Sequence, residues 1–181
     1  SNAASLLRAL NTMFDVPLDE QKCHQIAQKI GSDVPFFLAG GNVVNPYNDN
    51  LACVVYGRGE KYHLLSEFRK FFYVLICPEV HSSTVEAYKL VDENQDLIND
   101  GSCPVLNKLE EMYKMSVSEW QFYNSFTDVL CQQYPIIRQA LDDLKAFGSV
   151  YYQMSGSGSS VYGIFNSLEE AKIAHKKKKK K

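Results

Sequence analysis

The sequence lacks any long hydrophobic run, and no apolar stretch approaches the ~18 residues that a membrane-spanning helix needs. It also shows no secretory leader before its first helical pattern. Tryptophan occurs once and proline six times, yet aromatic residues make up 12% of the 181 residues, and no long polar tract interrupts them. The composition therefore excludes a disordered chain and predicts one domain, or two small ones, with a buried core.

The sequence has five cysteines, and their spacing argues against two common frameworks. The five cysteines are widely separated and form no C-x-x-C pair: Cys23, Cys53, Cys77, Cys103 and Cys131. This pattern favours reduced, mostly buried thiols in a cytoplasmic protein over a disulfide framework or a zinc site. The four histidines are also scattered without metal-ligand spacing, so we expect no metal site made by the protein itself.

The whole chain is almost neutral, but its C-terminal end is basic and the rest of the chain is acidic. The net charge is −2, and it becomes −8 without the six lysines of Lys176 to Lys181. An acidic body argues against nucleic-acid binding. We interpret the lysines as a solvated end. The alternative is a basic tail that binds nucleic acid or an anionic surface.

Hydrophobic spacing predicts a mixed order of helices and strands. The expected helices cover 3–14, 19–30, 84–91, 105–113, 119–133, 136–147 and 168–175, and the expected strands 51–56, 71–77, 150–154 and 161–165. A composition shift over 61–70 marks the expected domain boundary. The second half then reads as an α+β sandwich, with helices on one face of an antiparallel sheet.

The Gly/Ser loop, Ser155 to Ser160, separates the last two expected strands. It contains two glycines among four serines, whereas a hairpin turn needs only two to five residues. Such a loop has no bulky side chains, so its N–H and hydroxyl groups can reach the charged oxygens of a ligand. The alternative is a flexible connector. No histidine lies at the spacing of a hydrolase triad.

Asp33 is the strongest candidate for a catalytic group. Ser32 suits an N-cap and Pro35 the first turn of a short helix, which would place Asp33 at the positive end of that helix. A carboxylate held there is suited to act as a base or to orient a hydroxyl group. The alternative is a second capping residue beside Ser32.

Thr84 and Tyr88 lie four residues apart and share one face near the start of an expected helix. A hydroxyl and an aromatic ring in this arrangement could hold a planar base, or could be a cap and a half-buried tyrosine. Asn124 falls within the expected helix 119–133, where asparagine is a poor helix former, and Phe126 nearby suits packing.

These motifs occur together in the order of one family. They are Gly31 to Leu38, Gly57 to Glu60, Pro78 with Ser83-Thr84 and Ala87-Tyr88, Asn124 with Phe126, and Met154 to Ser159. In them the chain resembles the 4-diphosphocytidyl-2-C-methyl-D-erythritol kinases, which are GHMP-type small-molecule kinases. Ser1-Asn2-Ala3-Ala4 is similar to the end of that family's glycine-rich ATP loop.

The resemblance implies a fold, a division into domains and a reaction. The fold would be a partial ribosomal-protein-S5-like half followed by a ferredoxin-like α/β sandwich. Residues 1–65 would belong to the ATP-binding domain, 66–175 to the C-terminal domain, and 176–181 to a lysine tail. ATP, with Mg²⁺ on its phosphates, would phosphorylate the 2-hydroxyl of the cytidine-linked substrate in the non-mevalonate isoprenoid pathway. No nucleic acid or membrane partner is implied, and the protein would be a monomer or homodimer.

The resemblance also assigns roles to individual residues. Asp33 would be the catalytic aspartate, and Thr84 and Tyr88 would lie near the cytidine of the substrate. The nucleotide would be bound by Ser1, Asn2, Ser155, Gly156, Ser157, Gly158 and Ser159.

Two alternatives remain at this point. Homoserine and mevalonate kinases share the fold and a related Gly/Ser loop. The family's N-terminal strand, with its lysine, has no counterpart in these residues, so an inactive nucleotide-binding fragment is the other alternative and the 181 residues alone would have negligible activity.

Overall fold

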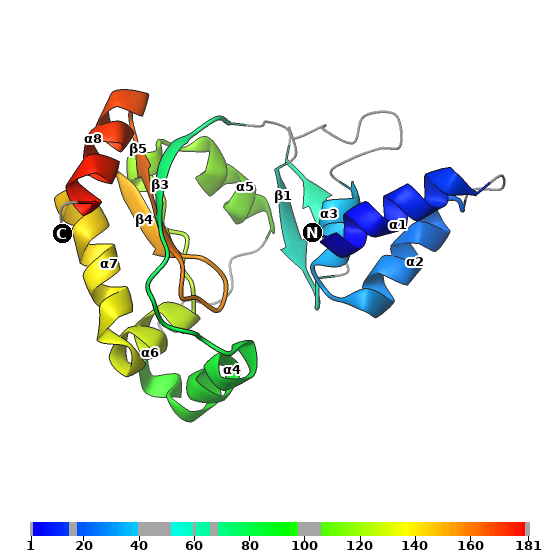
Figure 1. The fold of residues 1–181 in the computed structure, drawn as a ribbon, viewed down its shortest axis with the longest axis horizontal. Coiled ribbons are helices and arrows are strands. Elements are labelled where there is room, and N and C mark those ends of the chain that lie inside the picture. The colour runs from blue at the N-terminus through cyan, green and yellow to red at the C-terminus, as the bar shows by residue number, and fades with distance from the viewer. Residues whose placement is uncertain are drawn as a thin grey trace. The chain divides into compact units, whose positions relative to one another are not determined.

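The computed structural model describes residues 2–14, 18–39, 52–59, 61–65, 69–97 and 106–179. They belong to two compact units, Ser1–Arg69 and Lys70–Lys181, called unit 1 and unit 2 (Figure 1). The division falls inside the composition shift over 61–70 that was expected to mark it. Both units contain helices and strands, so the α+β class is confirmed.

The described residues of unit 1 form three helices and one hairpin. The helices are α1 (Asn2–Met13), α2 (Glu20–Ile30) and α3 (Val34–Ala39), and the antiparallel strands are β1 (Cys53–Tyr56) and β2 (Lys61–Leu64). Strand β2 was not predicted, because its lysine and histidine read as part of a polar boundary. The pairing of Val54 with His63 shows that this segment is the second arm of a hairpin.

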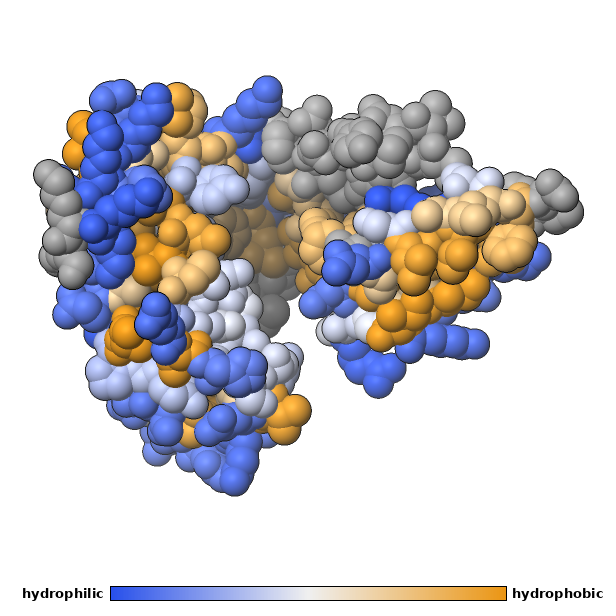
Figure 2. Space-filling model, viewed as in Figure 1, coloured by the Kyte–Doolittle hydropathy of each residue, from blue (hydrophilic) through white to orange (hydrophobic). Residues whose placement is uncertain are grey.

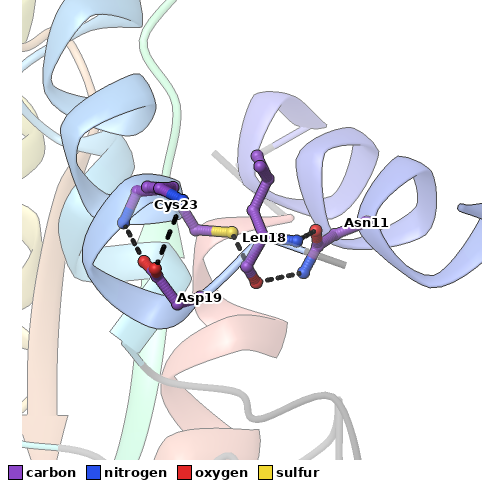
Figure 3. Close-up of polar contacts among 5 residues, drawn as sticks. Asn11, Leu18, Asp19 and Cys23 are labelled. Atoms are coloured by element: carbon purple, nitrogen blue, oxygen red, sulfur yellow. Dashed lines mark hydrogen bonds and ion pairs between the residues drawn. The ribbon is translucent and has the colours of Figure 1, made fainter. Parts of the chain in front are cut away.

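Side-chain hydrogen bonds join the end of α1 to the start of α2 (Figure 3). The Asn11 amide donates to the Leu18 carbonyl at 3.1 Å and accepts from the Leu18 N–H at 2.6 Å. Asp19 accepts from the Lys22 N–H at 2.7 Å, which confirms it as the N-cap of α2. The buried Asn11 side chain therefore supplies hydrogen-bond partners for the Leu18 N–H and carbonyl, which lie outside both helices.

An apolar patch of unit 1 remains exposed over α1 and α2 (Figure 2). Leu6, Leu10, Met13 and Phe14 were expected to share one face of the first helix, and all four side chains are exposed. The buried side chains of unit 1 are smaller, among them Ala4, Ala27 and Val34. Leu6, Leu10 and Met13 of α1 thus lie outside the core of unit 1, whereas Leu7 packs against it.

Unit 2 is built on a three-stranded antiparallel sheet in the order β3-β5-β4. Its strands are β3 (Phe72–Ile76), β4 (Tyr151–Met154) and β5 (Val161–Phe165). Its helices are α4 (Thr84–Glu93), α5 (Leu106–Lys114), α6 (Phe126–Gln133), α7 (Pro135–Ala146) and α8 (Leu168–Lys178), with short 3-10 turns at Gln95–Leu97 and Val117–Glu119.

Helices α7 and α8 cover one face of the sheet, as expected from the sequence (Figure 1). The buried core includes Ile76, Leu144 and Val161. Gly163 allows the close approach of β5 to α7, since a Cβ there would lie 2.9 Å from Ser149 Cβ and 3.0 Å from Leu144 Cδ2. The helices of this face therefore pack directly on the middle strand.

The opposite face of the sheet carries an aromatic cluster that was not predicted. Trp120 is at its centre, with ring centroids 5.5 Å from Tyr151, 5.3 Å from Phe71 and 5.1 Å from Phe122. Edge-on rings at these distances pack favourably. Burial raises the pKa of Tyr151, so its hydroxyl is protonated at neutral pH and donates to the Phe122 carbonyl.

The predicted helix over 119–133 was wrong in its first half. Glu119 ends a 3-10 turn, and α6 begins only at Phe126. The Asn124 carboxamide oxygen accepts from the Phe126 N–H at 3.0 Å, which is a local bond that competes with helix. Asn124 therefore lies before the helix and not within it.

The first three lysines of the expected tail belong to helix α8, which extends to Lys178. The Lys178 ammonium lies 2.9 Å from a carboxylate oxygen of Asp143 on α7. The Asp143 side chain is only 3% exposed, and the Gln139 amide also donates to it at 3.1 Å. This ion pair joins α8 to α7 at a buried carboxylate.

Lys178→Met should lower the free energy of unfolding of unit 2 by about 1–3 kcal/mol. The loss is smaller than the ~3–5 kcal/mol of a fully buried pair, because the Lys178 side chain is 35% exposed and water screens the pair. Urea unfolding followed by Trp120 fluorescence measures it. Lys176→Met, an exposed change on the same helix, is the control and should leave stability within about 0.5 kcal/mol. Equal losses in the two variants would contradict the role of the ion pair.

The cysteines agree in part with the expectation of buried thiols. Cys23 and Cys131 are buried, Cys53 is half-buried and Cys77 is exposed, whereas Cys103 lies outside the described residues. Burial raises the pKa of the Cys23, Cys53 and Cys131 thiols, which keeps them protonated at neutral pH. In the part of the chain that the structure describes, no helix has the length and apolarity to cross a lipid bilayer.

Candidate functional site

Asp33 lies at the start of α3, in unit 1. The helix begins at Val34, so Asp33 takes the position before it that the sequence had suggested for Ser32. The Asp33 carbonyl accepts from the Phe37 N–H at 3.5 Å, and its carboxylate accepts from the Ser32 hydroxyl at 3.4 Å. The side chain is exposed. The structure thus presents a carboxylate at the surface of unit 1, at the end of a short helix.

The turn between β1 and β2 packs against the residue before Asp33. Gly59 has a φ of +107°, which side-chain-bearing residues rarely adopt. A Cβ at Gly59 would overlap the carbonyl oxygen of Ser32 and lie 2.9 Å from Ser32 Cβ. The Gly57-Arg58-Gly59 turn therefore needs a glycine at position 59, both for its backbone conformation and for the close contact with Ser32. Ser32 immediately precedes Asp33, so this contact also bears on the placement of Asp33.

Arg8 of α1 holds the other end of α3. Its guanidinium donates to the carbonyls of Phe37 and Leu38, the latter at 3.0 Å. A short helix leaves its last carbonyls without partners inside the helix, and a cation placed there satisfies them. Contacts at both ends thus orient α3, and with it the backbone of Asp33.

The Gly/Ser loop connects β4 to β5 in unit 2 and has a defined conformation. The Ser155 N–H donates to the Ser160 carbonyl at 2.9 Å, and the Gly158 N–H donates to the Ser155 carbonyl at 3.0 Å. Gly156 and Gly158 have φ values of +55° and +77°. The N–H groups of Gly156, Ser157 and Ser159 have no hydrogen-bond partner among the described residues. The loop thus offers several backbone donors on a rigid frame.

Hydrogen bonds to residues at and just before the start of α4 hold this loop in place. Ser82 donates to the Ser157 carbonyl at 2.8 Å, and the hydroxyls of Thr84 and Ser157 lie 3.0 Å apart. The Ser159 hydroxyl donates to the Val80 carbonyl at 2.7 Å. These bonds link segments more than 70 residues apart in the chain. A flexible connector would not be bound in this way, so that alternative is disfavoured.

Gly158→Ala should destabilise unit 2 by roughly 2–4 kcal/mol, through positive-φ strain and overpacking. A Cβ at Gly158 would lie 2.9 Å from Met154 Sδ and 3.5 Å from Leu130 Cδ1, and both of these side chains are buried. Gly156→Ala is the matched control, because its Cβ would meet nothing within 4 Å and only the strain of about 1–2 kcal/mol remains. Urea unfolding followed by Trp120 fluorescence compares them, and an equal loss in both would refute the packing argument.

Tyr88 lies one turn beyond Thr84 on α4, as the spacing predicted. The Tyr88 side chain is 58% exposed, and the Phe126 ring meets it edge-on, with centroids 4.9 Å apart and planes at 88°. The Phe126 ring thus packs against the Tyr88 ring, and much of the Tyr88 side chain stays exposed to solvent. Such an exposed and supported ring can stack on a planar base.

The structure brings only some of the predicted site residues together. Thr84, Ser157 and the rest of the Gly/Ser loop form one site in unit 2, with Tyr88 on the same helix as Thr84. Asp33 and Asn2 belong to unit 1, where Asn2 is the exposed first residue of α1. Ser1 lies outside the described residues. That Asp33 and the Gly/Ser loop act in one reaction, as the resemblance implies, stays a prediction.

Sequence reasoning missed two contributors to the loop site. Ser82 was not among the predicted site residues, and Asn124 was placed within a helix. The signal for Asn124 was present in its poor helix propensity, because asparagine before an apolar helical pattern is a typical start signal. The described residues contain no group of three or more His, Cys, Asp or Glu side chains placed to hold a metal ion.

Comparison with known proteins relates both units to one family. Residues 89–180 match the family described as GHMP kinases C terminal. The chain is 33% identical to the 4-diphosphocytidyl-2-C-methyl-D-erythritol kinase of Treponema pallidum, over 97% of this chain and 59% of that protein. It is 34% identical to the enzyme of the same name from Prosthecochloris aestuarii, over 96% of this chain and 57% of that one.

A crystal structure of 4-(cytidine 5'-diphospho)-2C-methyl-D-erythritol kinase has a similar fold. It aligns with a TM-score of 0.66 at 23% identity, covering 98% of this chain and 59% of that chain. At this identity the likeness concerns the fold alone. The chain thus spans about three fifths of the length of the relatives that it matches.

Proposed function

The chain belongs to the GHMP kinase family, and from this premise we propose that the whole protein is an ATP-dependent kinase that phosphorylates an alcohol group of a small molecule. The proposed acceptor is the 2-hydroxyl of 4-diphosphocytidyl-2-C-methyl-D-erythritol, in the non-mevalonate route to isoprenoids. The observation that carries the proposal is a sequence identity of 33–34% with relatives of that name, along almost the entire chain.

In the proposed reaction Asp33 acts on the acceptor alcohol, and the Gly/Ser loop binds the nucleotide. The Asp33 carboxylate accepts the proton of the 2-hydroxyl while its oxygen bonds to the γ-phosphorus of ATP. The bond between that phosphorus and the β–γ bridging oxygen breaks, and ADP leaves with the electron pair. Phosphoryl transfer depends on positioning and charge stabilisation more than on covalent chemistry, so one aligned carboxylate and a set of donors suit it.

The Gly/Ser loop would hold phosphate oxygens of the nucleotide. The N–H groups of Gly156, Ser157 and Ser159 have no partner within the described part of the chain, and a bent backbone that presents successive N–H groups is a typical anion site. Ser1 and Asn2, which resemble the end of the family's ATP loop, are also proposed to bind the nucleotide. Thr84 and the exposed Tyr88 ring would contact the cytidine of the acceptor.

Magnesium is implied by the use of ATP, and it would arrive on the nucleotide phosphates and offset part of their charge. The described residues contain no carboxylate cluster suited to bind it without the nucleotide. We therefore assign no protein ligands to it and derive no step through it. The proposed location is the cytoplasm, where reduced thiols such as the buried Cys23 and Cys131 persist.

The test is a kinase assay on the protein as its gene encodes it, with ADP release measured for three acceptors. Turnover is expected with diphosphocytidyl-methylerythritol and not with mevalonate or homoserine. The opposite preference would reassign the acceptor within the family. A protein with no turnover, whose 181-residue chain binds CDP and not ATP, would instead be the inactive nucleotide-binding fragment.

A further inference from the structure

Asn124 connects three parts of unit 2 through one carboxamide. Its Nδ2 atom donates to the Met154 carbonyl at 2.9 Å and to the Gly156 carbonyl at 2.8 Å. Its oxygen accepts from the Phe126 N–H at 3.0 Å. All three bonds agree on one orientation of the amide, because carbonyls can only accept and an N–H can only donate.

The two carbonyls that accept from Asn124 differ in their exposure to solvent. Met154 is the buried last residue of β4, whereas Gly156 is an exposed residue within the Gly/Ser loop. One amide thus ties the point where the strand ends to the point where the loop turns. Gly156 has a positive φ and open space around it, so no side-chain packing of its own holds it in place.

Neighbouring contacts fix Asn124 itself. The Tyr151 hydroxyl donates to the Phe122 carbonyl at 3.1 Å, and the Thr127 hydroxyl donates to the Gln153 carboxamide oxygen at 2.7 Å. The segment from 122 to 127 therefore lies along β4 and is bonded to it on both sides of Asn124. From this segment, the Asn124 side chain reaches the Gly/Ser loop.

We propose that Asn124 is a positioning residue that holds the Gly/Ser loop in the conformation that receives the nucleotide phosphates. This inference rests on the proposed function, since the phosphates are those of ATP. The Gly156 carbonyl, which accepts from Asn124, shares one peptide plane with the Ser157 N–H, so this bond also sets the direction of that donor. Release of that carbonyl would free the Ser157 N–H to turn away from the phosphates.

Asn124→Asp is the sharpest test, because it keeps the shape of the side chain and replaces the donor with an oxygen. At neutral pH the new carboxylate faces two carbonyl oxygens and repels them. Asn166→Asp is the control, being the same change at an exposed position of unit 2. Asn124→Ala removes the bonds without the repulsion, and it replaces Asn124→Asp as the test if the aspartate variant does not fold.

Two measurements decide the proposal, and both use the full 181-residue chain or the complete gene product. Amide hydrogen exchange of the loop, including the bonded N–H groups of Ser155 and Gly158, should become about 10-fold faster or more in Asn124→Asp. ATP affinity by titration should fall about 10-fold, while CDP affinity changes less than about twofold. Asn166→Asp should match the unaltered protein in both.

Unchanged loop exchange in both Asn124 variants would overturn the proposal. So would faster exchange with unchanged ATP affinity, or equal losses of ATP and CDP affinity, which would indicate a merely structural role. A protein that binds ATP and phosphorylates no alcohol would refute the proposed function. The exchange and affinity results would still decide the role of Asn124 in that case.

Discussion

Asp33→Asn in the complete protein should lower kcat by about 10²–10⁴-fold and leave the KM values for ATP and the acceptor within about threefold. The amide has the shape of the carboxylate but cannot accept a proton from the attacking hydroxyl. The fold should be unaffected, because asparagine is as good a residue as aspartate at the start of a helix and Asp33 is exposed there. Steady-state kinetics with ADP detection measures the effect.

Asp19→Asn is the matched control for this experiment. Asp19 is also an exposed aspartate at a helix start in unit 1, where its carboxylate accepts from the Lys22 N–H, and an asparagine oxygen can do the same. The control should retain the kcat of the unaltered protein. If Asp33→Asn retained it as well, Asp33 would have no part in proton transfer, and another base would have to be sought.

Gly59→Ala should destabilise unit 1 by roughly 3–6 kcal/mol, the sum of backbone strain and a steric overlap that side-chain motion cannot relieve. The new methyl group meets the carbonyl of Ser32, which is backbone, whereas the Met154 side chain beside Gly158 can move in part. The displaced residue immediately precedes Asp33. We therefore expect the complete protein to lose activity even where enough of unit 1 stays folded to be assayed.

Hydrogen exchange of peptides from 18–39 and 52–65 measures this effect within unit 1, which Trp120 fluorescence does not report because Trp120 lies in unit 2. Gly148→Ala is the control for strain placed outside unit 1, since Gly148 lies in unit 2, its φ is +94° and a Cβ there meets nothing within 4 Å. Gly148→Ala should leave exchange in unit 1 unchanged. Protection of α3 at the level of the unaltered protein in Gly59→Ala would show that the turn does not restrain Ser32.

Local signals in the sequence were sufficient for most helices and strands. Asp19 and Gly31 bound α2 where a capping residue and a helix-ending glycine were expected, and the apolar run before Pro78 is strand β3. The failures occurred where two local tendencies compete. Strand β2 carries polar residues in an exposed hairpin, and the stretch from 119 to 125 has helical spacing that the hydrogen bond from Phe126 N–H to Asn124 interrupts.

For the candidate site, too, the sequence determined some features and the tertiary structure decided the others. By itself the sequence determined which residues are suited to the chemistry: a carboxylate at a helix start, a loop of glycine and serine, and a threonine and tyrosine on one helical face. These are properties of residue type and short spacing, and short-range sterics and hydrogen bonding decide them. The family followed from their order along the chain.

Only the tertiary structure decided what holds these residues in place. Ser82 and Asn124 reach the Gly/Ser loop from 75 and 32 residues away, and Gly59 meets Ser32 across a turn. No spacing rule predicts such pairs, because they depend on how the sheet and helices pack and not on neighbours in the chain. The sequence thus determined which chemical groups are candidates for the site, and packing decided which side chains orient them.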